Sequence, residues 1–119
     1  MNRENLRLLI EHVESLPSEG LDMSDYVNDC GTALCLAGHA ALLDGCALRA
    51  EEGYDIFYFE RDGEGVSAFL VARDWLGLSH TVASSLFFAK GWPFPRSMSL
   101  HKVTKEQALE ALRTLEAGR

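Results

Sequence analysis

The chain has 119 residues, of which 47% are hydrophobic and 24% are charged, and its formal net charge is −7. This length suits one domain with a real hydrophobic core, and the composition is too apolar for sustained disorder. The longest apolar run, residues 32–43, is too short to cross a bilayer, and the charged start of the chain lacks the pattern of an export signal. We therefore expect a single cytoplasmic domain over residues 1–119, with reduced cysteines and no membrane segment.

The charge is distributed unevenly along the chain. Residues 1–60 carry twelve acidic and three basic side chains, whereas residues 61–119 carry six acidic and eight basic ones, so the halves have charges of −9 and +2. An acidic half argues against duplex DNA as its ligand, because phosphate binding needs clustered Lys and Arg. The four basic residues between 90 and 105 are too few to change this, so we expect a basic protein partner rather than direct nucleic-acid binding.

The first half of the chain predicts two helices. Apolar residues recur at helical spacing between Asn2 and Leu16, Asn2 is a suitable N-cap, and Pro17 follows the last turn. Residues 18–31 form a predicted loop, with at most a brief strand over 23–27. Residues 32–43 are rich in Ala and Leu and apolar nearly all round, which is typical of a buried central helix.

The second half predicts a hairpin and three helices. Aromatic and β-branched residues followed by turn residues predict a short strand or β-hairpin arm near residues 54–66. Helical spacing returns over residues 66–76 and again from Ser79 to about residue 89. A capping box at Thr104 opens the last helix. The fold class is therefore mainly α: a compact bundle of about five short helices around residues 32–43, with an arm at 51–65 that protrudes from it.

One segment resembles a known family. Its residues are Cys30-Gly31-Thr32-Ala33-Leu34-Cys35-Leu36-Ala37-Gly38-His39-Ala40, and further matches follow in the same order as far as the last helix. The segment is similar to small uncharacterised proteins of bacteria and their phages that carry a Cys-Gly-Thr-x-x-Cys-x-Ala-Gly signature. The resemblance implies a compact helical domain, often encoded in mobile elements, and it implies no activity, cofactor or partner. The acidic aromatic segment of residues 51–64 is longer than the connection that we expect at this place in the family.

Three residues of that segment have the side-chain types of metal ligands. Cys35 and His39 are four residues apart and would share one helix face, and Cys30 precedes the predicted helix. Their spacing differs from a paired Cys-x-x-Cys site, so core packing is the favoured interpretation and we expect neither a cofactor nor an enzyme. The alternative is a small Cys/His metal-binding protein, or a cysteine-dependent enzyme in which His39 activates Cys30.

The candidate partner-binding surface is the acidic aromatic arm. Alternation along a strand places Tyr54, Ile56 and Tyr58 on one face and Asp55, Phe57 and Phe59 on the other, so one aromatic face is left exposed. Aromatic side chains rimmed by acids are typical of a binding site for a basic surface, although a plain strand with a solvated turn is the simpler interpretation. The candidate residues are Tyr54, Asp55, Phe57, Phe59, Glu60, Asp62 and Glu64.

These observations lead to one hypothesis of function. The chain is predicted to be a non-enzymatic protein-interaction module of phage or prophage type that binds a basic partner surface. An inhibitor of a host defence system, such as an anti-CRISPR-like or DNA-mimicking protein, is one specific form of this hypothesis. A homodimer formed through the same arm is another.

Overall fold

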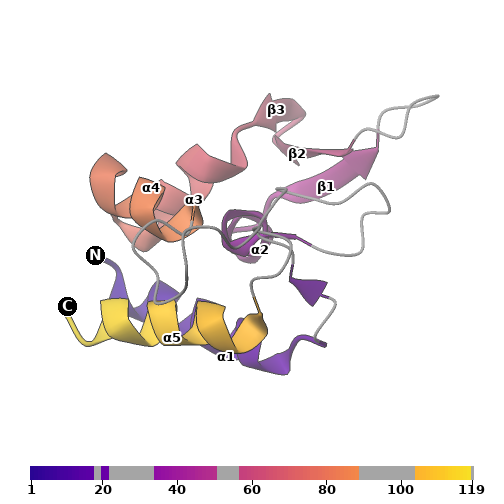
Figure 1. Cartoon of the computed structure of the whole chain (residues 1–119). Coiled ribbons are helices and arrows are strands. Elements are labelled where there is room, and N and C mark those ends of the chain that lie inside the picture. Colours follow the sequence, from indigo (N-terminus) through magenta and orange to yellow (C-terminus); the bar gives the residue numbers. More distant parts are fainter. Residues whose placement is uncertain (18–19, 22–33, 51–56, 89–103, 119) are drawn as a thin grey trace.

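The computed structural model describes residues 1–17, 20–21, 34–50, 57–88 and 104–118. Within these residues the chain forms five helices and one three-stranded antiparallel sheet (Figure 1). The prediction of a mainly helical chain is confirmed. The elements are α1 (Arg3–Ser15), α2 (Leu36–Leu43), β1 (Ala47–Ala50), β2 (Phe57–Arg61), β3 (Glu64–Val66), α3 (Ala68–Leu76), α4 (His80–Phe87) and α5 (Lys105–Glu116).

Side-chain caps begin four of the helices, as their sequences indicate. Asn2 accepts a hydrogen bond from the amide of Asn5 at the start of α1, and Ser67 and Ser79 play the same part for α3 and α4. At α5 the predicted capping box is present, because Thr104 and Gln107 each accept the other's backbone amide. Each cap provides a partner for a backbone amide that the helix itself leaves unpaired.

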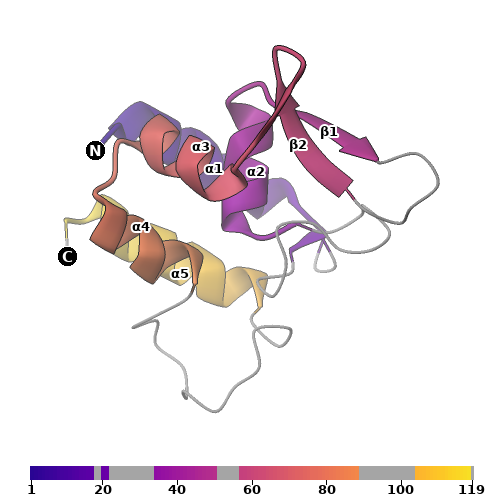
Figure 2. The same ribbon diagram turned by 90° about the horizontal axis from the view of Figure 1, so that it is seen from above.

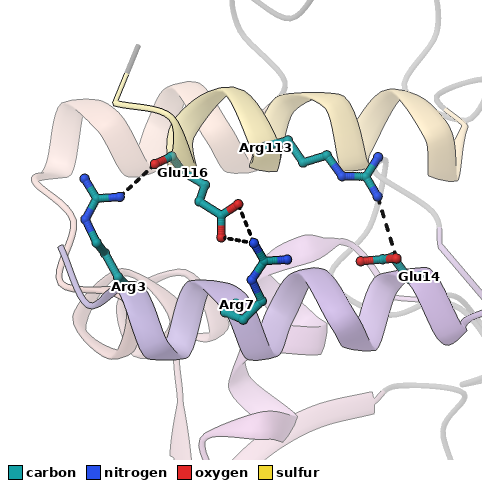
Figure 3. Close-up of polar contacts among 5 residues, drawn as sticks. All are labelled: Arg3, Arg7, Glu14, Arg113 and Glu116. Atoms are coloured by element: carbon teal, nitrogen blue, oxygen red, sulfur yellow. Dashed lines mark hydrogen bonds and ion pairs between the residues drawn. The ribbon is translucent and has the colours of Figure 1, made fainter.

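Helices α1 and α5 lie antiparallel, side by side, and are joined by charged side chains (Figure 3). A guanidinium nitrogen of Arg7 lies 2.7 Å from the carboxylate of Glu116, and Arg113 lies 3.7 Å from Glu14. At the other end of α5, Lys105 donates to the carbonyls of Glu14 and Leu16, where α1 ends. A lysine in this position complements the negative end of the helix dipole.

The main core lies between α1, α2, α3, α4 and α5. The buried stripe of α1 packs against α5, α3 and α2. Helix α2 supplies small residues, including Ala37 and Ala40, that have no exposed surface. Small side chains permit close helix packing, and the contact between α2 and α3 is the most extensive among the described elements. Residues Leu36–Ala41 of α2 are buried, as predicted, and the helix lies beside α3 (Figure 2). Of the helices described, none is both long enough and apolar enough to traverse a bilayer.

Two predicted helices begin later than expected. Helix α2 starts at Leu36 rather than at residue 32, because Leu34 pairs in a parallel bridge with Leu21 and Cys35 has an extended backbone. Helix α3 starts at Ala68, because Val66 pairs with Phe59 in the sheet. In both places apolar residues continue the helical pattern although their backbone belongs to a strand or bridge. The strand predicted over residues 23–27 lies outside the described residues.

Candidate interaction surface

The sheet has strand order β1-β2-β3, and its second hairpin is closed by a tight turn. The two turn residues, Asp62 and Gly63, have φ angles of 54° and 84°. Positive φ at both central positions is the geometry of a two-residue type I′ hairpin, for which Asp-Gly is a preferred sequence. The hairpin predicted near residues 54–66 is therefore present over β2 and β3. Strand β1, which pairs with β2 on the other side, was not predicted.

The inner face of the sheet carries Phe59, which is 4% exposed. It packs in a second, smaller core cluster with Leu34, Ala41, Cys46 and Ala68. The prediction that Phe59 belongs to the exposed partner-binding face is therefore wrong. The alternation along β2 is real, but contact with α2 and α3 turns the Phe59 face inward.

The outer face of the sheet carries Tyr58 and Glu60. Tyr58 is 39% exposed and lies directly across from Arg49 on β1. Arg49 also lies 3.6 Å from the carboxylate of Glu60, so this acid is partly neutralised within the sheet. Tyr58 therefore offers the accessible aromatic surface on β2, a role that the sequence pattern assigned to Phe59.

The tip of the hairpin carries the two exposed acids Asp62 and Glu64. The neighbouring cation, Arg61, is directed elsewhere, because its guanidinium donates to both the carboxylate and the carbonyl of Asp44. The hydrogen bond with Asp44 raises the pKa of Arg61. Neither Asp62 nor Glu64 forms an ion pair with any residue in the described part of the chain. We call Tyr58, Asp62 and Glu64 the hairpin surface.

The structure describes only part of the predicted arm. Phe57 is the first residue of β2 and pairs with Ala50. Tyr54 and Asp55 lie outside the described residues, as does Cys30 of the alternative metal site.

The other two candidate metal ligands are buried. Cys35 is 3% exposed at the N-cap of α2, and His39 is 4% exposed within that helix. The Nε2 atom of His39 lies 2.8 Å from the carbonyl oxygen of Gly20, and its Nδ1 atom lies 3.0 Å from Nε2 of His12. Both ring nitrogens of His39 thus have hydrogen-bond partners, which leaves neither of them open to a metal ion or to a thiol. No group of three or more metal-ligating side chains comes together within the described residues.

Burial sets the charge state of this histidine pair. Loss of solvation lowers the pKa of His39 to about 4, and it lowers the pKa of His12 as well. Sequence reasoning overlooked His12. The signal was its position on α1, three residues after the buried Leu9 and therefore beside the apolar stripe.

Comparisons of the chain with protein-family models, with curated proteins and with solved structures find no match. The resemblance to the proteins with the Cys-Gly-Thr-x-x-Cys-x-Ala-Gly signature stays a prediction from the residues themselves.

Proposed function

We propose that the protein is a non-enzymatic protein-interaction module that binds a basic partner through the hairpin surface. The observation that carries this proposal is a pair of exposed carboxylates, Asp62 and Glu64, that form no ion pair with any described residue, on the same hairpin as the exposed Tyr58. An accessible aromatic ring close to acidic groups is suited to a surface rich in Lys and Arg.

The hairpin is held in position before any partner binds. Phe59 anchors β2 in the smaller core cluster, and its cross-strand partner Val66 packs against that cluster from β3. Figure 2 shows the hairpin turn projecting beyond the helices. A surface that is already ordered loses less conformational entropy on binding, so each contact contributes more to affinity.

The charges around the hairpin surface support a basic protein as the partner. Glu60 and Asp44 are matched by Arg49 and Arg61, so the carboxylates left for recognition in the sheet are those at the tip. The net charge of −7 adds long-range attraction toward a cationic surface. Two copies of the chain would bring like charges together at their tips, which disfavours a homodimer through this surface.

Proteins that handle nucleic acids carry such basic surfaces, because they neutralise phosphates. Inhibition of a host defence protein of this kind, in the manner of an anti-CRISPR-like protein or a DNA mimic, is the specific form of the proposal. It rests on the acidic hairpin surface and on the resemblance of residues 30–40 to proteins of mobile elements.

The test is affinity capture from host lysate with a charge-neutral variant, Asp62→Asn with Glu64→Gln. Asn tolerates the positive φ of position 62, so the turn is preserved while two charges are removed. The matched control, Glu11→Gln with Glu110→Gln, removes two exposed charges from α1 and α5. We expect the wild type and the control to retain a basic protein that salt elutes, and the hairpin variant to lose it. Retention of the same proteins by all three would refute the proposal.

A further inference from the structure

The His12–His39 pair is hydrogen-bonded to the backbone at the carbonyl oxygen of Gly20, which we call the Gly20 junction. This oxygen accepts from Nε2 of His39 at 2.8 Å and from the amide of Leu34 at 3.3 Å. Leu21 pairs with Leu34 in a parallel bridge at the same place. Gly20 and Leu21 are therefore joined to Leu34 at the point where His39 donates its proton.

We propose that His12 and His39 form a proton-sensitive clamp that joins α1, α2 and the Gly20 junction. The clamp holds while the pair carries at most one added proton, and a second proton opens it. The proposal does not rest on the proposed function, because it involves none of the residues of the hairpin surface.

The hydrogen-bond chemistry determines how many protons the pair can hold. A carbonyl oxygen only accepts, so neutral His39 has its proton on Nε2 and its Nδ1 atom accepts the proton of His12 Nε2. One added proton leaves both bonds intact, because a cationic His12 still donates from Nε2. A second proton places two N–H groups and two positive charges face to face across 3.0 Å, and the bond between the rings is lost.

Among the described residues, no acidic side chain has a resolved influence on the pKa of His39. Burial is the main cause that lowers the pKa of His39, and charge repulsion from His12 lowers it further, while hydrogen bonds to the backbone of Gly20 and Leu34 act in the opposite direction. On α3, Arg73 pairs with Asp74, and at the end of α1, Glu14 pairs with Arg113. Glu11 on α1 and Glu110 on α5 are exposed to solvent. Helix α2 has no charged residue apart from His39 itself. Within the described residues, His12 is the charged neighbour with a resolved influence on His39.

The direction of the pH effect follows from these pKa values. An open His39 takes up a proton near its ordinary pKa of 6.5, whereas the clamped residue resists it down to about pH 4. The open form therefore binds more protons between these values, so acidification within this window favours opening. Above pH 6.5 the clamp is fully closed.

The first experiment uses the wild-type protein and measures imidazole nitrogen chemical shifts by NMR, first at about pH 7.5 and then through an acid titration. We expect a neutral His39 protonated at Nε2. A His39 protonated at Nδ1, or two histidines that titrate independently near their ordinary pKa, would overturn the proposal without any mutation.

The second experiment follows amide hydrogen exchange of Leu34 at the junction, with Leu112 in α5 as the internal reference. Between about pH 7.5 and about pH 4.5 we expect protection of Leu34 to fall about tenfold or more relative to Leu112. In the His12→Gln variant the side-chain amide can donate to neutral His39 or accept from its protonated form, so protection should persist to lower pH. His80→Gln, on the exposed start of α4, is the control and should behave as the wild type. Equal loss at Leu34 and Leu112, or identical profiles for His12→Gln and the wild type, would contradict the clamp.

Discussion

The α1–α5 pair and the β2–β3 hairpin both expose acidic side chains, but they arrange them in opposite ways. Glu14 and Glu116 on the helices face Arg113 and Arg7, so each charge has a partner on the neighbouring helix (Figure 3). At the hairpin tip, Asp62 and Glu64 have no such partner within the described residues. Glu14 and Glu116 thus join elements of the same chain, whereas Asp62 and Glu64 at the hairpin tip are available to another molecule.

The two regions also differ in how much core supports them. The helices share one large apolar cluster, while the sheet is attached through a smaller cluster in which Phe59 is the largest of the buried residues that the structure describes. A single substitution should therefore detach the hairpin more readily than it disturbs the helix pair.

Phe59→Ala should have the largest effect. Removal of the buried ring should lower the free energy of unfolding by about 3 kcal/mol through lost burial and the cavity left behind. Urea denaturation measures this loss. Tyr58→Ala removes the neighbouring exposed ring and should cost less than about 1 kcal/mol. Equal losses in the two variants would mean that β2 does not depend on its inner face for attachment.

Acidification should have the second-largest effect, because it should lower the stability of the helical region. The folded-state pKa of His39 is lowered, so its contribution to stability is complete above pH 6.5 and is lost as the pH falls toward about 4. Between about pH 7 and about pH 5 the free energy of unfolding should drop by roughly 1 to 2 kcal/mol. Urea titrations at several pH values check this, with His80→Gln as control. A flat profile over this range would show that His39 does not resist protonation in the folded state.

The third comparison is between Gly77→Ala at a helix junction and Gly65→Ala in the hairpin. Gly77 has a φ of 65°, and an added Cβ would lie 3.2 Å from the amide nitrogen of Asn2 at the start of α1. We expect a loss of about 1 kcal/mol in a thermal or urea unfolding experiment. Gly65→Ala on β3 meets nothing within 4 Å and should change stability by less than about 0.5 kcal/mol. A larger loss of stability for Gly65→Ala than for Gly77→Ala would contradict the close approach at Gly77.

Arg7→Gln should have the smallest effect. The side chain of Arg7 is half exposed, so its ion pair with Glu116 should contribute only about 0.2 to 1 kcal/mol, and less in high salt. Asp62→Asn with Glu64→Gln removes no ion pair within the described residues and should leave stability unchanged. Urea denaturation at low and high salt checks both. A larger salt-dependent loss in the hairpin variant than in Arg7→Gln would reverse the comparison between the two regions.

Several local features were predictable because short-range chemistry decides them. Asn2, Ser79 and the Thr104 capping box begin helices where their side chains suit exposed backbone amides, and Asp62-Gly63 closes a turn that needs positive φ. Such choices depend on a few neighbouring residues, so they can be recognised without knowledge of the rest of the chain.

Tertiary contacts decided the remaining features, because they join residues that are far apart in the chain. Alternation along β2 identifies two faces, but only packing against α2 and α3 determines that Phe59 is buried and Tyr58 is exposed. The pairing of β1 with β2 likewise depends on a partner strand. His12 and His39 are 27 residues apart, and they meet only because α1 packs against α2. A strand pattern or a single histidine carries no information about the distant surface that will cover it, so burial, charge pairing and protonation emerge only when the chain has folded.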